Sequence, residues 1–162
     1  MREIIPVVND KDRIIGYKNR SDILPNDIYR VSALWITNSK GDILLAQRSL
    51  TKKNDPGMWG PAVAGTVSKG ITYKKTITKE AHEEIGLDNI IPKKGPKIQM
   101  SNEHVYFVQW YFLKINKNIN EFIIDREEVR TIKWFTRQEL KKELKNNPKI
   151  FPKRIKILMN IF

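Results

Sequence analysis

Apolar residues recur at every second position in several segments of the chain, and these segments are rich in β-branched and aromatic side chains. Such alternation is typical of strands that bury one face. Strands are therefore expected at residues 3–8, 14–18, 28–37, 43–47, 61–67, 104–115 and 129–135. Polar turn residues at 9–13 and 38–42 separate neighbouring strands, which predicts a hairpin at each of these positions.

A helical period begins at residue 72. Between 72 and 85 the apolar residues Ile77, Ala81 and Ile85 recur every four positions, which predicts an amphipathic helix. Gly86 follows at the place where a helix commonly ends, because glycine readily adopts the left-handed conformation found there.

Two more helices are expected after the last strand. Thr136 and Glu139 have the spacing of a capping box, which favours a helix that begins at Thr136 and ends at Pro148. An amphipathic segment at about 152–162 predicts a final helix. Together these elements indicate an α+β protein, in which helices pack on the faces of a mixed, largely antiparallel sheet as an α/β/α sandwich.

The chain has 162 residues, a net charge of +12 and no cysteine. This length suits one domain with a hydrophobic core. The lack of cysteine excludes a disulfide scaffold, a thiolate zinc site and a cysteine nucleophile. No apolar run approaches the roughly 20 residues that span a bilayer. The N-terminus lacks the pattern of a signal peptide, so a cytoplasmic protein without membrane contact is expected.

Three further segments bear on function: the basic residues near the C-terminus and two expected loops. The basic residues near the C-terminus form either a solvated face or a contact for a polyanion such as nucleic acid; they are Lys141, Lys142, Lys145, Lys149, Lys153, Arg154 and Lys156. A long loop is expected at 49–60, and loops of this length are often functional. A basic loop is expected at 93–97.

The strongest chemical signal is a group of three glutamates in the helix expected at 72–85. Glu80, Glu83 and Glu84 are spaced i, i+3 and i+4, so they share one helix face beside the apolar stripe. Such carboxylates repel one another unless a cation binds them, and Mg²⁺ prefers oxygen ligands. A solvated acidic face is the plain alternative. The glycine-containing turn before the helix favours a site, because it can bring backbone N–H groups close to a phosphate.

Residues 65–87 resemble the Nudix box, whose pattern is G-x5-E-x7-R-E-U-x-E-E-x-G-U with U an apolar residue. The matching positions are Gly65, Glu80, Ala81, Glu83, Glu84, Gly86 and Leu87. Residues 41–49, 56–59 and 64–65 resemble the branch of the family that includes isopentenyl-diphosphate isomerase, and 128–135 resembles a later strand of the family.

The resemblance implies one Nudix domain over residues 1–162, with a Nudix-type α/β/α sandwich around a central mixed sheet. The N-terminal hairpin would occupy about 1–20, the box 65–87 and the C-terminal helices about 136–162. The implied reaction is hydrolysis of a diphosphate bond in a nucleoside diphosphate linked to another group. A small-molecule diphosphate is then the expected partner, and a homodimer through the N-terminal hairpin is a weaker expectation.

By position, the resemblance assigns Glu80, Glu83 and Glu84 as catalytic ligands of Mg²⁺ or Mn²⁺, which would activate a water molecule. Gly65 and Lys79 are expected to contact the substrate.

Three residues outside the box are further candidates. Glu103 is either the general base or an extra ligand, or else a loop glutamate in water. Arg48 is either a phosphate-binding residue or a surface salt-bridge partner. Trp59 either stacks on a base or anchors its loop on the sheet.

Two positions of the box depart from the pattern. Ile71 stands where the family has its first glutamate, and Lys79 stands where it has arginine. Because both changes occur together, neither partner is left unpaired, but the rate of hydrolysis is in question. The alternative to a hydrolase is therefore a catalytically weak domain that binds nucleotide or RNA. The isomerase uses a catalytic cysteine, so isomerase activity is not expected. A purely structural role leaves the glutamate spacing unexplained.

Overall fold

The computed structural model of the protein describes residues 3–101, 104–152, 155, 158 and 159. In that part of the chain, nine strands form one mixed sheet. The strands are β1 (Ile4–Val8), β2 (Ile14–Asn19), β3 (Ile28–Thr37), β4 (Ile43–Arg48), β5 (Trp59–Pro61), β6 (Val63–Thr66), β7 (Lys93–Ser101), β8 (Val105–Lys114) and β9 (Val129–Phe135). The helices are α1 (Tyr73–Ile85) and α2 (Arg137–Asn146), with short 3-10 turns at Arg20–Asp22, Ile119–Glu121 and Pro148–Ile150.

Strand β3 lies at the centre of the sheet. It pairs in parallel with β8 over its whole length, from Ile28 opposite Val105 to Thr37 opposite Lys114. It also pairs antiparallel with β1, β4 and β6. The β1–β2, β4–β5, β4–β9 and β7–β8 ladders are antiparallel as well. The predicted mixed, largely antiparallel sheet is confirmed.

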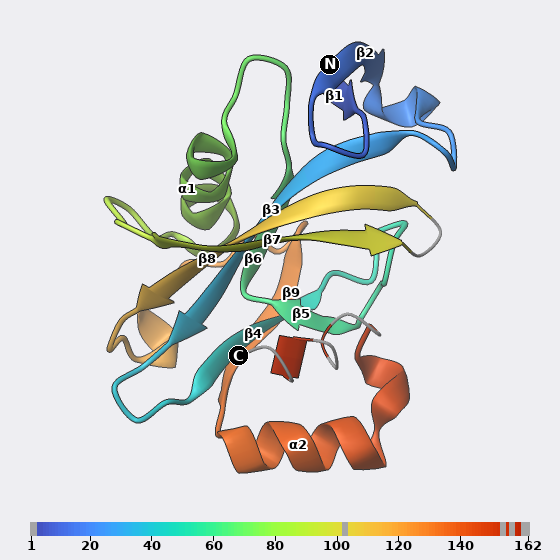
Figure 1. Cartoon of the computed structure of the whole chain (residues 1–162). Helices are drawn as coiled ribbons and strands as arrows, with labels where there is room; N and C mark the ends of the chain where they lie inside the picture. Colours follow the sequence, from blue (N-terminus) through green and yellow to red (C-terminus); the bar gives the residue numbers. More distant parts are fainter. Residues whose placement is uncertain (1–2, 102–103, 153–154, 156–157, 160–162) are drawn as a thin grey trace.

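The two helices lie on opposite faces of the sheet (Figure 1). Side chains alternate along β3, so Leu34 and Ile36 join the core beneath α1, whereas Ala33 and Trp35 join the core that contains Leu140 of α2. Each face is therefore apolar and covered, and the predicted α/β/α sandwich of the α+β class is confirmed. No helix in the described ranges is long and apolar enough to cross a membrane.

Helix α1 has the ends that the sequence predicts. The Thr72 side chain accepts a hydrogen bond from the N–H of Lys75 at 3.2 Å. At the other end, Gly86 has a φ of 67°, and the N–H of Leu87 donates to the carbonyl of Ala81 at 2.9 Å. This left-handed ending suits glycine and satisfies a carbonyl of the last turn.

Helix α2 begins with the predicted capping box. Thr136 Oγ1 accepts the N–H of Glu139 at 3.1 Å, and Glu139 Oε2 accepts the N–H of Thr136 at 2.8 Å. The final helix expected at 152–162 lies largely outside the described residues. Ile155 and Leu158 are described, and both are buried in the core on the α2 side.

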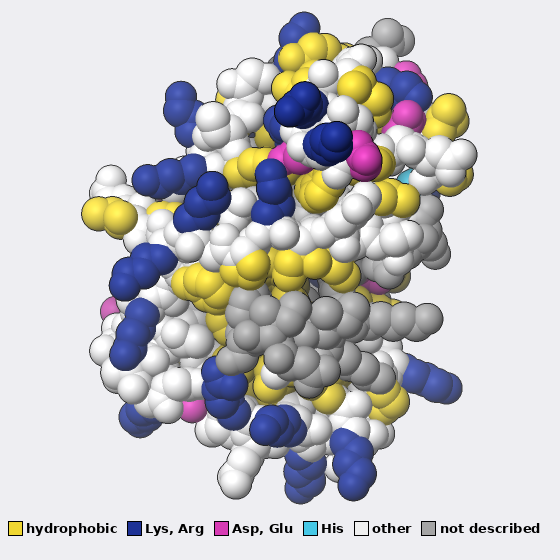
Figure 2. All heavy atoms as spheres, in the orientation of Figure 1, with side chains coloured by type: hydrophobic (Ala, Val, Ile, Leu, Met, Phe, Trp, Pro, Cys, Tyr) yellow, Lys and Arg dark blue, Asp and Glu magenta, His cyan; other side chains and the backbone are white. Residues whose placement is uncertain are grey.

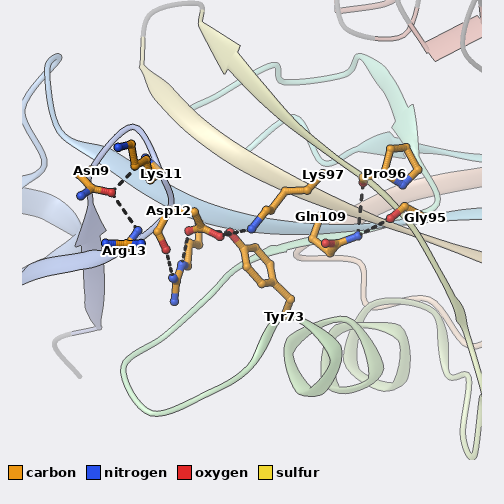
Figure 3. Close-up of polar contacts among 10 residues, drawn as sticks. Asn9, Lys11, Asp12, Arg13, Tyr73, Gly95, Pro96, Lys97 and Gln109 are labelled. Atoms are coloured by element: carbon orange, nitrogen blue, oxygen red, sulfur yellow. Dashed lines mark hydrogen bonds and ion pairs between the residues drawn. The ribbon is translucent and has the colours of Figure 1, made fainter.

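The prediction of a basic loop at 93–97 is wrong. These residues form the first half of β7, and the register against β8 shifts across Gly95 and Pro96. Gln109 of β8 donates from Nε2 to the carbonyl of Gly95 at 2.8 Å (Figure 3). A proline and several lysines fit here because an edge strand needs no ladder on its outer side, and charge keeps that edge from pairing.

The strand expected at 61–67 is divided in the structure. Strand β5 pairs with β4, and β6 pairs with β3, so the chain passes from one neighbour to the other at Ala62. The long loop expected at 49–60 accordingly ends at Met58. This passage brings the backbone around Ala64 and Gly65 beneath α1, because β6 contacts that helix directly.

The turn between β1 and β2 carries a buried carboxylate. Asp12 has a left-handed φ of 58°, and its side chain is only 6% exposed. Three donors lie around it: Arg30 Nε of β3 at 2.6 Å, Lys97 Nζ of β7 at 2.5 Å and the Tyr73 hydroxyl of α1 at 3.1 Å. Lys97 and Tyr73 are seen beside Asp12 in Figure 3. Burial acts to raise the pKa of Asp12, but the hydrogen bonds from Lys97 and Arg30 outweigh it and lower that pKa. The ionised carboxylate therefore ties the N-terminal hairpin to two strands and to the start of α1.

Candidate functional site

Helix α1 places Glu80 and Glu84 against strand β6. A Cβ atom at Gly65 would lie 2.4 Å from Cγ of Glu80, so only glycine leaves room for this glutamate. Glu84 is 8% exposed, and its Oε2 accepts the backbone N–H of Ala64 at 3.4 Å. The two carboxylates thus lie in neighbouring positions between the helix and the strand.

A small cavity of about 60 Å³ lies beside Glu84. Three of its lining side chains are charged: Arg48 at the end of β4, Glu84 of α1 and Glu128 just before β9. The other lining residues are Ala46, Gly60, Pro61, Ala62, Ala64 and Val129. Strands β4, β5, β6 and β9 therefore supply a small, mostly apolar wall around two carboxylates and one guanidinium group.

The environment of the carboxylates opposes their negative charge. Burial, followed by the charges of Glu80 and Glu128, raises the pKa of Glu84 to about 8, although the Ala64 N–H and the Arg48 charge act in the other direction. Burial is also the main cause that raises the pKa of Glu80, and nearby glutamates add to it while Lys79 opposes it. A cation bound at these oxygens would relieve both the burial cost and the repulsion.

Glu83 does not share this environment. Its side chain is 50% exposed, and its Oε2 lies 2.5 Å from Nζ of Lys79. The same ammonium lies 3.7 Å from Oε1 of Glu80. The helical spacing puts the glutamates on one broad face, but packing separates Glu83 at the rim from Glu80 and Glu84 against β6.

The donor set suits a hard divalent cation. Glu80 and Glu84 present carboxylate oxygens, and the nearby negative charge of Glu128 adds to a repulsion that a bound cation would relieve. Within the described part of the chain, no three acidic or imidazole side chains are gathered closely enough to form a metal site as they stand. The carboxylate oxygens of the site suit Mg²⁺ or Mn²⁺ as ligands. In the structure Lys79 holds Glu83 in an ion pair, and Lys52 holds Glu128 in another.

The family model of the NUDIX domain matches residues 28–154. The chain belongs to the Nudix family. An uncharacterised Nudix hydrolase of Listeria monocytogenes is 26% identical over 119 residues, which cover 73% of this chain and 69% of the relative. An isopentenyl-diphosphate Delta-isomerase 2 of Photorhabdus laumondii is 25% identical over 164 residues, covering 99% of this chain and 92% of the relative. The crystal structure of DR0079 from Deinococcus radiodurans has a TM-score of 0.82 at 22% identity and covers 98% of both chains, which shows a shared fold.

In this Nudix domain Arg48 lies at the cavity beside Glu84, whereas Trp59 does not. Arg48 lines the cavity, and its Nε donates to the carbonyl of Asn54 at 2.9 Å. Trp59 is not one of the described residues that line the cavity. Its ring packs edge-on against that of Phe135, with centroids 5.2 Å apart. This contact supports the interpretation of Trp59 as an anchor. Glu103 lies outside the described residues.

Sequence reasoning did not identify Glu128 as a candidate for this Nudix site. Val129 pairs with Arg48 across β4 and β9, and the Glu128 carbonyl accepts the N–H of Ser49 at 3.0 Å. Oε1 of Glu128 also lies 2.5 Å from Nζ of Lys52. The pairing of strands could have indicated it, because pairing the strands predicted at 43–47 and 129–135 places Glu128 beside the end of β4.

Proposed function

We propose that the protein is a Nudix hydrolase that uses Mg²⁺ or Mn²⁺ to cleave the diphosphate bond of a nucleoside diphosphate linked to another group. The observation that carries this proposal is the pair of carboxylates packed on strand β6: partly buried Glu80 against Gly65, and buried Glu84 against Ala64 beside a cavity that Arg48 also lines.

The residues of this site have distinct parts in the proposed reaction. Glu80 and Glu84 would hold the cation, with Glu83 joining them from the rim. A bound divalent cation lowers the pKa of a water molecule and neutralises charge on the phosphates. Arg48 would bind a phosphate with its guanidinium donors. Glu128 is the proposed proton acceptor at the cavity, alongside Glu103 as the candidate from the sequence.

Isomerisation of isopentenyl diphosphate is not part of this proposal. A relative named as an isopentenyl-diphosphate isomerase matches nearly the whole chain. The present chain contains no cysteine, however, and the residues just before Gly65 are the apolar Ala62, Val63 and Ala64. Incubation with isopentenyl diphosphate is expected to yield no dimethylallyl product, and clear turnover would contradict this exclusion.

A hydrolysis screen tests the proposed function. The panel contains nucleoside triphosphates, nucleotide sugars, dinucleoside polyphosphates, coenzyme A and prenyl diphosphates, each with Mg²⁺, with Mn²⁺ and with a chelator. Turnover is expected with metal only, on at least one nucleotide substrate, and it should be lost in the Glu84→Gln variant. Metal-independent turnover, or turnover that survives this substitution, would contradict the proposed site.

A catalytically weak domain that binds nucleotide or RNA is the second candidate, because of the surface charge. Figure 2 shows Lys and Arg side chains spread over one face, with few acidic side chains between them. The exposed basic residues of β7 and α2 include Lys93, Lys94, Lys97, Lys141, Lys142 and Lys145. Binding through phosphate contacts alone should weaken steeply with salt and survive Glu84→Gln, with no hydrolysis in the screen.

Replacing Gly65 with Ala should impair the site without unfolding the protein. The new Cβ would lie 2.4 Å from Cγ of Glu80, so this side chain must move away from its place against β6. A displacement of about 1 Å in a catalytic constellation can cost about 100-fold in rate, and we expect a loss of this order. Steady-state kinetics measure it, with Gly16→Ala as the control because nothing lies within 4 Å of a Cβ at that glycine. Equal activity of the two variants would show that the position of Glu80 is not critical.

A further inference from the structure

The ammonium group of Lys79 lies between two of the glutamates in the site. Its Nζ is 2.5 Å from Oε2 of Glu83, four residues further along α1, and 3.7 Å from Oε1 of Glu80. The Lys79 side chain is 59% exposed, so it can leave this position and enter solvent without disturbing the core. One positive charge thus already neutralises part of the cluster that the proposed function assigns to a divalent cation.

An ammonium group and a divalent cation compete for the same carboxylate oxygens. Glu83 cannot give its Oε2 to a metal ion while that atom is the close acceptor of Lys79. A lysine that stays near Glu80 also repels a cation bound there. At about 5 Å in water, repulsion between a single and a double positive charge is worth about a ten-fold change in affinity.

We propose that Lys79 is an internal competitor of the divalent cation, so that the side chain at position 79 sets the cation concentration at which the site fills. This inference rests on the proposed function, since it requires Glu80 and Glu83 to be ligands. Lys79 must release Glu83 when the cation binds, while its charge stays near Glu80, the next residue along α1, and still repels the cation. Its part at the site is regulatory, and it is separate from the contact with substrate that the sequence predicted for it.

The plain alternative is an ordinary lysine–glutamate pair on the surface of a helix. Pairs at i, i+4 stabilise a helix modestly. That role would affect thermal unfolding and would leave cation affinity unchanged. Direct measurement of cation binding therefore separates the two roles, whereas a rate measurement alone does not.

Titration with Mn²⁺, followed by the electron paramagnetic resonance signal of the free ion, tests the inference. We expect Lys79→Met to bind Mn²⁺ about five- to ten-fold more tightly than the unsubstituted protein, because the competing charge is removed. Lys79→Arg keeps the charge and should stay within about two-fold. The matched control is Lys74→Met, which removes an exposed lysine from a different side of the same helix and should also stay within about two-fold.

The outcomes distinguish this inference from the proposed function. If Lys79→Met binds Mn²⁺ with unchanged or lower affinity while the unsubstituted protein binds it, the inference is wrong and the proposed function stands. If Lys74→Met tightens binding as much as Lys79→Met, general surface charge is responsible and the inference is also wrong. If none of the proteins binds Mn²⁺, both the inference and the proposed metal-dependent function are contradicted.

Discussion

In the Glu84→Gln variant, metal-dependent hydrolysis is expected to fall by at least about 100-fold, while the fold gains stability at alkaline pH. The loss of activity follows from the loss of a negatively charged ligand beside the cavity. The gain in stability follows from burial, because Glu84 is 8% exposed and its pKa is raised to about 8, mainly by desolvation.

The pH dependence of this gain has a defined sign. The pKa of Glu84 rises from 4.5 to about 8 on folding, so the native state holds its proton more tightly than the unfolded chain. The stability that the protonated carboxyl contributes is complete below pH 4.5 and is lost as the pH rises to about 8. Glutamine does not titrate. The stability of Glu84→Gln relative to the unsubstituted protein should therefore increase by about 2 to 4 kcal/mol between pH 5 and pH 8.

Urea unfolding at pH 5 and pH 8, with a chelator present, measures this change, and initial rates with Mn²⁺ measure the activity. Glu127→Gln is the matched control, because Glu127 is exposed and lies next to Glu128 in the chain. That variant should keep the same relative stability at both pH values and retain hydrolysis. A relative stability of Glu84→Gln that does not increase with pH would contradict the burial argument, and retained turnover would contradict the role of Glu84.

Removal of the Asp12 carboxylate is expected to produce the largest loss of stability. The Asp12 side chain is 6% exposed and pairs with the Arg30 side chain, which is itself only 18% exposed. Breaking a buried ion pair by removing one partner leaves the other charge uncompensated, which typically costs about 3 to 5 kcal/mol. Lys97 reaches solvent more easily, so we expect Asp12→Ala to lower the free energy of unfolding by about 3 kcal/mol.

Urea unfolding at pH 7 measures this loss. Asp10→Ala is the matched control, because Asp10 lies in the same turn and is exposed. It should change the free energy of unfolding by less than about 0.5 kcal/mol. Because hydrogen bonds from Lys97 and Arg30 lower the pKa of Asp12 despite its burial, the difference between the two variants should shrink as the pH falls into the acid range. Equal stability of the two variants at pH 7 would mean that the hairpin is held by other contacts.

Local chemistry in the sequence was enough to place most elements and the main chemical signal. Alternating apolar residues located β3 and β9 with their observed bounds. Thr136 and Gly86 located helix ends because caps depend on residues adjacent in the chain. The glutamate spacing in α1 identified the helix face that meets β6. It also indicated the Nudix family, whose domain model matches residues 28–154.

Register and burial, which the sequence pattern does not contain, decided the rest of the candidate site. Helical spacing groups Glu83 with Glu84, but packing against β6 buries one and leaves the other in contact with Lys79. Glu128 enters the cavity only because β9 pairs with β4. Asp12 becomes a buried anchor only because segments distant in the chain converge on it. The sequence by itself thus determined the strands, the helix caps and the carboxylate face, since these depend on neighbours along the chain. The tertiary structure decided which carboxylates are buried and which cations they meet, since those depend on long-range pairing.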